Sequence, residues 1–184
     1  QAAVTIIDQY TGDVKAIVGG RGDKSGSRTL NRATDTVRQP GSTFKVLAAY
    51  APALDTAGMT LATVQDDAPY TYSNGTSLRN YDNSYRGFTT IRYAITKSIN
   101  VVTVKTLTDI SPQVGYDYLQ NFGFTTLVPE DIVESLSLGG ITRGVTNLEL
   151  TAAYATIADM GNYIRPRFYT RILDHSGNVL IDNT

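Results

Sequence analysis

The sequence predicts an α+β fold, in which a helical cluster packs on a small antiparallel sheet. Three observations predict this class. β-Branched residues recur near the start of the chain and again near its end, and each run contains a turn. The residues between them form apolar stretches with helix-start and helix-stop signals. A chain of 184 residues buries about 70% of its unfolded surface, so we expect one sizeable core.

A hairpin is predicted at each end of the chain. Residues 4–7 and 14–18 are β-branched runs that flank a turn at residues 11–13. Residues 167–182 alternate polar and apolar side chains around a Ser-Gly-Asn turn. His175 is the only histidine of the chain, and we expect it to be a solvated turn residue.

Two helical stretches are predicted in the first half of the chain. Residues 42–55 are apolar nearly all round, which predicts a helix that is buried on most sides. Pro52 should kink or end this helix. A second stretch starts near residue 89 and continues through residues 91–107, with a possible break at Ser98.

Two further helices carry explicit boundary signals. Ser111, followed by proline, is a good N-cap, and Gly123 is a good stop. Thr146 and Glu149 have the spacing of a capping box, and Gly161 is expected to end that helix. Strong caps of this kind predict the last helix most clearly.

The connecting segments are polar. Residues 19–41 are rich in Gly, Ser, Arg, Asp and Thr and are predicted to be a loop. Residues 66–88 are polar, aromatic and turn-rich, which favours a long surface excursion. We expect the pair Asp66 and Asp67 within it to form a solvated turn rather than a metal site.

The composition excludes several classes of function. The chain has 16 basic and 17 acidic residues, which argues against a strongly basic nucleic-acid binder. It contains no cysteine, so thiolate metal sites and cysteine nucleophiles are excluded. We expect no metal and no cofactor. We find no signal peptide and no apolar run long enough to span a membrane, and the abrupt start without methionine suggests an excised segment.

The stretch RQPGSTFK, residues 38–45, places Ser42 and Lys45 three positions apart. On a helix that starts at Ser42 the two side chains share a face, so the amine can reach the hydroxyl. An uncharged lysine can take the proton of a serine and activate it as a nucleophile. The backbone N–H of Ser42 can also point at an oxyanion. The pair is therefore a candidate for covalent acyl transfer.

The charge of Lys45 must be lost for this chemistry. Lowering its pKa from about 10.4 to about 7 takes about 4 kcal/mol, and a helix dipole supplies about 2 kcal/mol at most. We expect burial to supply much of the rest. The alternative is that Ser42 is a helix cap with a lysine nearby, because serine is a favoured cap and one Ser-x-x-Lys is expected by chance in a chain of this size.

A second candidate motif is Ser98-Ile99-Asn100. The hydroxyl and the carboxamide face the same way only if the helix breaks there. In that case Ser98 could relay a proton to a leaving amine, while Asn100 holds a substrate amide. A second Ser-x-Asn at residues 176–178 is interpreted as a hairpin turn.

Three stretches resemble, in the same order, the penicillin-binding transpeptidase domain of class A, bifunctional penicillin-binding proteins. They are RQPGSTFK, NYDNSYRGFTTIRYAITKSIN and LGGITRGVTNLELTAAYATIADMGNYIRP. The resemblance implies a penicillin-binding, serine β-lactamase-like fold. It also implies a serine D,D-transpeptidase that attacks the terminal D-Ala-D-Ala of a peptidoglycan stem peptide, releases D-alanine and cross-links neighbouring strands. β-Lactam antibiotics would acylate the same serine.

The resemblance assigns a role to each candidate residue. Ser42 is the nucleophile and supplies a backbone oxyanion donor, Lys45 is the base, Ser98 is the proton shuttle and Asn100 holds the substrate amide. It further implies a bacterial parent protein that is anchored in the membrane and acts at its extracytoplasmic face. Nucleic acid is not an expected partner.

The sequence departs from the family pattern in one respect. No Lys-Thr-Gly, Lys-Ser-Gly or His-Thr-Gly follows Asn100 up to Thr184. Lys24-Ser25-Gly26 precedes Ser42, so we reject it as the third motif. We therefore expect residues 1–184 to be a partial transpeptidase domain, incomplete on its C-terminal side and weak or inactive alone. An unpaired sheet edge would then favour association with a second chain or with itself.

Two other functions stay open at this point. A serine β-lactamase shares the nucleophile motif, but the expected Glu-x-x-x-Asn pattern for deacylation is absent, and Ser-Ile-Asn differs from the usual Ser-Asp-Asn. A β-lactam sensor or a non-catalytic cell-wall-binding module would need no intact Ser-x-x-Lys. Replacing Ser42 by alanine separates a binder, which keeps its affinity, from an acyl-transfer enzyme, which loses covalent labelling.

Overall fold

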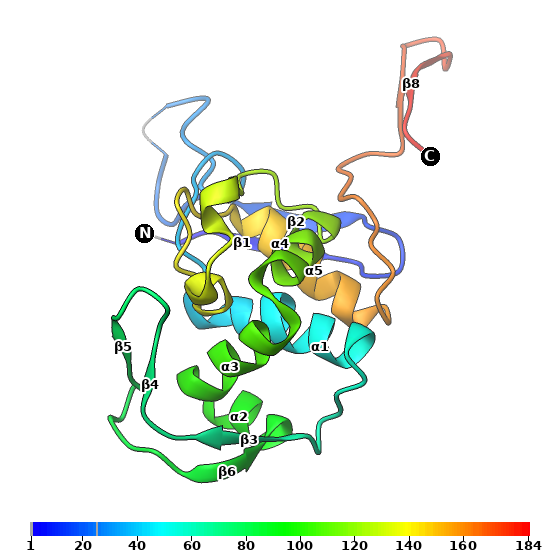
Figure 1. Ribbon diagram of the computed structural model, residues 1–184. Helices are drawn as coiled ribbons and strands as arrows, with labels where there is room; N and C mark the ends of the chain where they lie inside the picture. The colour runs from blue at the N-terminus through cyan, green and yellow to red at the C-terminus, as the bar shows by residue number, and fades with distance from the viewer. Residues whose placement is uncertain (1, 25) are drawn as a thin grey trace. The chain divides into compact units, whose positions relative to one another are not determined.

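The computed structural model describes residues 2–24 and 26–184 (Figure 1). The chain forms two compact units. The first combines Gln1–Arg38 with Val145–Thr184, and the second is Gln39–Gly144. All four candidate site residues lie in the second unit. Ser25, part of the rejected Lys-Ser-Gly, lies outside the described residues.

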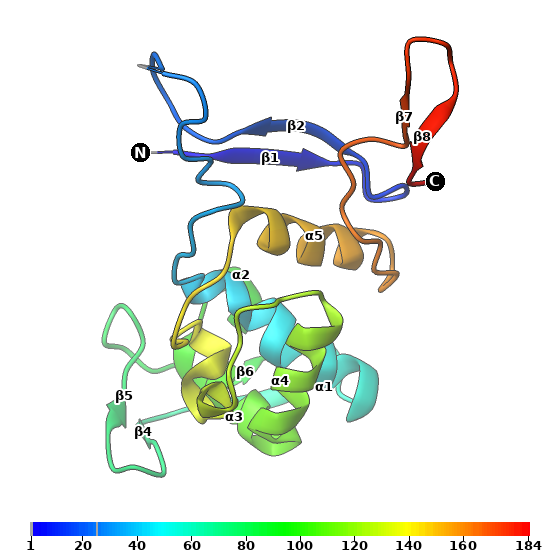
Figure 2. The ribbon, with the colours of Figure 1, turned by 90° about the horizontal axis from the view of Figure 1, so that it is seen from above.

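In the first unit, an N-terminal hairpin packs on one helix. Strand β1 (Val4–Ile7) pairs antiparallel with β2 (Val14–Val18), at the bounds that the sequence predicts. Helix α5 (Asn147–Ala158) lies along this hairpin (Figure 2). Thr5 Oγ1 donates a hydrogen bond of 2.7 Å to Asn147 Oδ1, which ties the strand to the first residue of the helix.

The capping box that starts α5 is confirmed. Thr146 Oγ1 accepts from the N–H of Glu149 at 3.1 Å, and the Glu149 carboxylate accepts from the N–H of Thr146 at 3.0 Å. Gly161 follows the helix with a φ of 97°, a conformation that glycine adopts without strain. Both boundary signals therefore act as predicted.

The C-terminal hairpin is also confirmed. Strand β7 (Arg171–Leu173) pairs antiparallel with β8 (Val179–Asp182). The Asp174 carboxylate accepts hydrogen bonds from the N–H groups of the turn that connects them. The second Ser-x-Asn, residues 176–178, is thus a turn, and His175 beside it is exposed.

The second unit begins with one continuous helical segment. It passes through a 3₁₀ turn, η1 (Gly41–Thr43), a π-helix, η2 (Lys45–Tyr50), and helix α1 (Ala51–Thr56). Pro52 is predicted to kink or end this helix; it does not end it, because the segment continues to the end of α1. Pro52 lies in the first turn of α1, which follows the π-helix η2 directly. The missing N–H of a proline costs little in the first turn of a helix. π-Helical turns are rare and often lie at functional sites.

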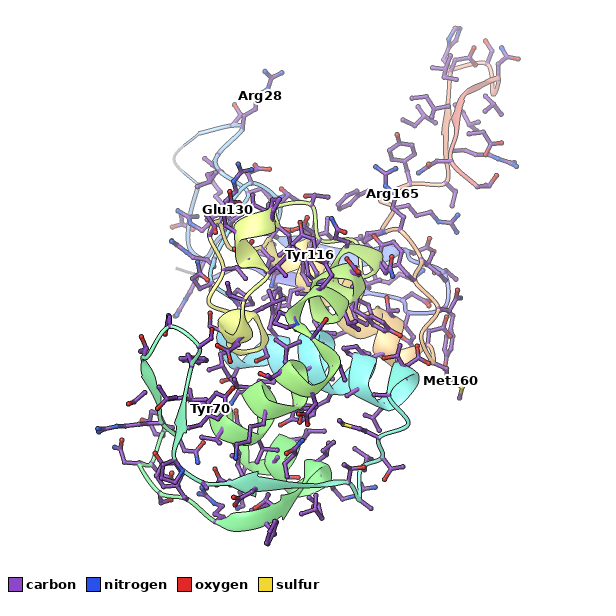
Figure 3. All side chains as sticks on the ribbon, viewed as in Figure 1. Arg28, Tyr70, Tyr116, Glu130, Met160 and Arg165 are labelled. Carbon is purple, nitrogen blue, oxygen red and sulfur yellow. The ribbon has the colours of Figure 1, made fainter. Side chains whose placement is uncertain are left out.

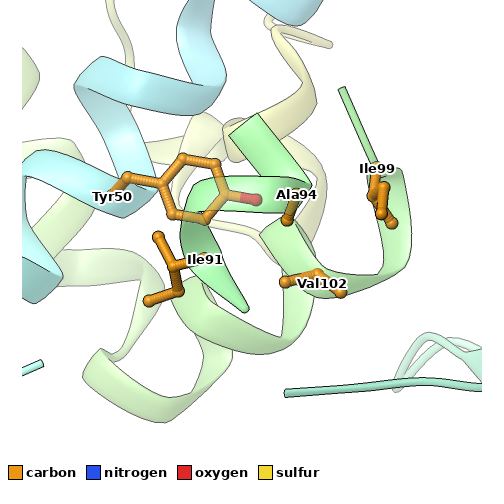
Figure 4. Packing of buried hydrophobic residues seen from close by; sticks show 5 residues of the cluster. All are labelled: Tyr50, Ile91, Ala94, Ile99 and Val102. Atoms are coloured by element: carbon orange, nitrogen blue, oxygen red, sulfur yellow. The ribbon is translucent and has the colours of Figure 1, made fainter. Parts of the chain in front are cut away.

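The other helices of this unit match their predicted boundaries. The segment predicted from residue 89 is split into α2 (Ile91–Lys97) and α3 (Asn100–Ile110), so the break at Ser98 is confirmed. Helix α4 (Pro112–Asn121) starts at its predicted cap, where Ser111 Oγ accepts from a backbone N–H of the first turn. Figure 4 shows a core cluster that joins η2 to α2 and to the start of α3: Tyr50, Ile91, Ala94, Ile99 and Val102.

The segment predicted to be a surface excursion contains four short strands. Strand β3 (Val64–Asp67) pairs with β6 (Gly87–Thr90), and β4 (Tyr70–Thr71) pairs with β5 (Ser77–Leu78). Tyr70 lies beside α3 (Figure 3), with the amine of Lys105 5.9 Å from its ring centroid.

The prediction of a solvated Asp66-Asp67 turn is wrong for Asp67. This residue is only 1% exposed and lies at the end of β3. Its carboxylate is paired inside the unit by Asn80 and Arg86. Buried carboxylates need such partners, and the polar sequence around Asp67 gives no sign of them.

The remaining elements are two short 3₁₀ helices, η3 (Pro129–Asp131) and η4 (Glu134–Leu138). The α+β class is confirmed, but the described strands form four separate two-stranded antiparallel sheets instead of one. Within residues 2–24 and 26–184 we find no helix with the length and apolar character needed to cross a membrane.

Candidate active site

Ser42 lies in the 3₁₀ turn η1, and its side chain is exposed. The interpretation of Ser42 as a helix cap is wrong. The helical segment starts one residue earlier, Pro40 occupies the cap position, and no side chain caps the turn. The hydroxyl of Ser42 is therefore available for other chemistry.

The turn that carries Ser42 is held in place by residues 139–141 of a later segment. The Gln39 side chain bonds to the main chain of Ile141 twice, donating to its carbonyl and accepting from its N–H at 3.0 Å. Gly139 has a φ of 72°, and a Cβ added there would lie 2.4 Å from the backbone nitrogen of Gly41. This close backbone contact is possible only for glycine, and it supports the residue that precedes Ser42.

Lys45 is the first residue of η2 and is only 3% exposed. Its Nζ lies 2.6 Å from the Ser98 carbonyl oxygen, 2.9 Å from Ser98 Oγ and 2.6 Å from Asn100 Oδ1. Ser42 is not among these partners. Burial lowers the pKa of the Lys45 amine from 10.5 to about 8. The expectation that desolvation makes this lysine less basic is thus supported.

The main chain at Ser98 explains how both residues of the motif reach one amine. Ser98 adopts a left-handed conformation, with φ 53° and ψ 47°, between α2 and α3. Such a conformation costs a non-glycine residue about 1–2 kcal/mol, and it interrupts the helix. Ser98 and Asn100 therefore point to the same side, as a continuous helix would not allow. Ser98 also lines a hollow of about 80 Å³ with Lys97 and Arg86.

The three partners of Lys45 determine which hydrogen bonds its charged and its uncharged form can make. A charged ammonium has three N–H groups, which match three acceptors. An uncharged amine has two N–H groups and one lone pair. The Ser98 carbonyl and Asn100 Oδ1 can only accept, so the Ser98 hydroxyl is the partner that can donate to that lone pair. A proton can therefore pass between Lys45 and Ser98 without any large movement of heavy atoms.

The orientation of the Asn100 amide follows from its other contact. Asn100 Nδ2 donates to the carbonyl oxygen of Arg79 at 2.9 Å, so Oδ1 must be the atom that faces Lys45. One N–H and one lone pair of the amide remain for a further partner.

Sequence reasoning missed the residue behind this motif. Asn80 is 4% exposed, and its side chain contacts the N–H groups at the start of α3. The stretch NYDNSYRGF that begins at Asn80 is part of the family resemblance, but neither spacing nor periodicity assigns a role to its first residue. No group of three or more acidic or histidine side chains placed to hold a metal occurs in the described part of the chain.

Comparison with known proteins identifies the class to which this site belongs. The Transpeptidase family, described as "Penicillin binding protein transpeptidase domain", matches residues 2–183. The chain therefore belongs to the penicillin-binding protein transpeptidase family.

Individual relatives agree with this family. The chain is 39% identical over 196 residues to penicillin-binding protein 1A of Clostridium acetobutylicum, covering 100% of this chain and 24% of that protein. It is 37% identical to penicillin-binding protein 1F of Bacillus subtilis over 183 residues, with coverage of 100% and 25%. A solved structure of penicillin-binding protein 1A from Haemophilus influenzae superposes with a TM-score of 0.82 at 28% identity, covering 98% of this chain and 26% of that one. The chain thus spans about a quarter of the length of these relatives.

Proposed function

We propose that this chain carries the nucleophile and the proton-transfer residues of a serine D,D-transpeptidase. One observation supports this most directly. A buried lysine from the Ser-x-x-Lys motif bonds to both polar side chains of the Ser-x-Asn motif, which lies more than fifty residues away in the sequence. Two short motifs that are common by chance rarely converge on one desolvated amine.

In the proposed reaction, Ser42 attacks the carbonyl carbon of the penultimate D-alanine of a stem peptide. Its proton passes to the uncharged amine of Lys45 as the Oγ–C bond forms. The C–N bond then breaks, and Ser98 passes a proton from Lys45 to the nitrogen of the leaving D-alanine. An amine from a neighbouring strand then attacks the acyl carbon. A C–N bond forms, the Oγ–C bond breaks, and the proton that the amine loses returns to Ser42 Oγ. Catalytic hydrogen bonds commonly tighten only when substrate is in place, which is compatible with an exposed Ser42.

Two further contacts complete the proposal. The backbone N–H of Ser42 lies in the first turn of η1, where amides have no partner within the helix, so it can bind the oxyanion. Asn100 keeps one N–H and one lone pair, and these would bind the amide of the stem peptide.

The proposed partners and location follow from the family. The partners are peptidoglycan stem peptides and β-lactam antibiotics. The place of action is the extracytoplasmic face of a bacterial membrane, to which we infer that the parent protein is anchored. Cross-linking of peptidoglycan by the whole protein is part of the same proposal.

We propose that residues 1–184 form only part of the catalytic domain. They contain Ser-x-x-Lys and Ser-x-Asn, but no Lys-Thr-Gly follows. In the family the third motif supplies a cation, a carboxylate-binding hydroxyl and a second oxyanion donor. Losing a single oxyanion donor costs about 3–4 kcal/mol in a related setting, so acylation of this chain alone should be slow.

A labelled penicillin tests the function. The chain is incubated with the label, and mass spectrometry locates the adduct. We expect slow labelling on the peptide that holds Ser42, and none in Ser42→Ala. Tight non-covalent binding that survives Ser42→Ala would instead support a sensor or binding module. Rapid turnover of nitrocefin would support a β-lactamase. Labelling at another residue would refute the assignment of the nucleophile.

A further inference from the structure

Helix α3 starts without a cap of its own. Its cap residue is Ile99, which has no polar side chain, and no side chain of that residue pairs with the first N–H groups. Serine one residue earlier would be an ordinary candidate, but Ser98 Oγ bonds to Lys45. The N–H groups of the first turn would be left unpaired in a buried setting, which is costly.

A side chain from a distant turn supplies the missing cap. Asn80 Oδ1 accepts from the N–H of Asn100 at 3.0 Å and from the N–H of Val101 at 3.1 Å. Asn80 Nδ2 donates to Asp67 Oδ1 at 2.7 Å and to the carbonyl of Ser84 at 2.9 Å. All four hydrogen-bonding positions of this amide are therefore occupied, so it has one orientation.

The Asp67 carboxylate, which accepts a hydrogen bond from Asn80, is itself held in place by Arg86. Asp67 has no exposed side-chain surface, and its second oxygen accepts from the N–H of Arg86 at 3.1 Å. The Arg86 guanidinium lies 3.6 Å from the same oxygen and also pairs with Asp82. A buried carboxylate that is held in this way keeps the donor side of the Asn80 amide in place.

The next contacts lead directly to the candidate catalytic amine. Asn80 accepts a hydrogen bond from the main-chain N–H of Asn100, and the side chain of Asn100 accepts one from the amine of Lys45. Ser98, two residues before it, meets the same amine twice. Because Ser98 has a strained left-handed backbone, its position depends on how firmly the start of α3 is held.

We propose that Asn80 is a positioning residue for acyl transfer. It caps α3 in place of Ser98, which leaves the Ser98 hydroxyl free for Lys45, and it fixes the register in which Ser98 and Asn100 meet that lysine. The inference rests on the proposed function where it concerns the reaction. Its structural part, the placement of Ser98 and Asn100 against Lys45, stands apart from any activity.

Four variants test this role. Asn80→Ala removes the cap. Asn80→Asp keeps the acceptor for α3 but turns a carboxylate toward Asp67. The double variant D67N/N80D exchanges the two groups, so that the new amide donates to the new carboxylate. It loses the bond to the carbonyl of Ser84 and the ion pair between residue 67 and Arg86. Thr146→Ala deletes the cap of α5 and serves as the matched control, because it removes a helix cap in the other unit.

Two readouts are measured on each variant. The first is the NMR titration of the Lys45 side chain in the free protein, assigned by its loss in Lys45→Met. The second is the rate of acylation by a fluorescent penicillin, separated into initial binding and the covalent step. A misplacement of about 1 Å can cost about 100-fold in rate, so we expect a 10- to 100-fold loss in the covalent step, with little change in binding.

The expected pattern is as follows. Asn80→Ala and Asn80→Asp raise the pKa of Lys45 toward its ordinary value, because water reaches the amine, and both slow the covalent step. D67N/N80D recovers both readouts in part, and Thr146→Ala changes neither. If both single variants fail to fold, Asp67→Asn, which loosens the amide without removing it, should show the same pattern at smaller amplitude.

The outcomes separate this inference from the function on which it rests. A folded Asn80→Ala with the Lys45 titration of the unmodified chain would overturn the positioning role, whatever the activity, as would equal effects in Thr146→Ala. If the unmodified chain forms no adduct at Ser42, the proposed function fails, and the titration still decides whether Asn80 sets the surroundings of Lys45.

Discussion

The buried amine of Lys45 should make the stability of this protein depend on pH in a defined window. In the folded chain its pKa is about 8, and in the unfolded chain it is close to 10.5. At about 1.4 kcal/mol for each unit of pKa, this difference corresponds to about 3 kcal/mol. Lys45 is only 3% exposed, and burial is the cause of the lowered pKa.

The sign follows from proton binding. Below pH 8 both states hold the proton, and the folded state bears the cost of a buried charge. Between about pH 8 and 10.5 the unfolded chain holds the proton while the folded chain has lost it. Since the unfolded state then binds more protons, the free energy of unfolding rises with pH across this window.

Lys45→Met isolates this contribution, because methionine fills a similar volume and does not titrate. Urea unfolding of both proteins, followed by far-UV circular dichroism, is measured at pH 7 and at pH 10. The other lysines and the tyrosines titrate alike in both proteins and cancel. We expect the unmodified chain to gain about 2–3 kcal/mol relative to the variant between these two pH values.

A constant difference between the two proteins across that range would refute the reasoning. It would mean that the amine titrates near its ordinary value and that its burial carries no cost. A change in the opposite direction would mean that the folded chain prefers the charged form, and that the three acceptors around the ammonium outweigh the cost of its burial.

Three other predictions concern the site and the sheets. The covalent step of penicillin labelling should rise with pH and level off above about pH 8, because Lys45 must lose its proton to act as a base. Gly139→Ala should destabilise the chain by more than about 2 kcal/mol in urea unfolding and slow labelling, because a Cβ would lie 2.4 Å from the backbone of Gly41, at a φ of 72°. Leu180→Lys should reduce self-association in analytical ultracentrifugation, because β8 carries apolar side chains that are exposed along its length.

Each of these has a control. A labelling rate that does not vary between pH 6 and pH 9 would exclude a titrating base. Gly140→Ala is the control for Gly139→Ala, because a Cβ at residue 140 would meet only the carbonyl oxygen of Ser135, at 3.9 Å. Equal effects at both glycines would show that the contact with Gly41 is unimportant. If the unmodified chain sediments as a monomer, the exposed hairpin is not a site of association.

The sequence by itself determined the elements whose boundaries are set by local chemistry. Thr146 with Glu149 and Ser111 with its proline start helices because short-range hydrogen bonds decide a helix end. The two terminal hairpins follow from alternation and turn residues in the same way. The family, and with it Ser42, Lys45, Ser98 and Asn100 as candidates, also came from the sequence, through a resemblance.

Only the tertiary structure decided what surrounds those residues. The burial of Asp67 and the cap that Asn80 gives to α3 depend on contacts between segments far apart in the chain. The same holds for the pKa of Lys45, because a sequence does not state how much water reaches an amine. Local propensities act over one turn or one strand, whereas desolvation and cross-segment hydrogen bonds exist only once the chain has folded.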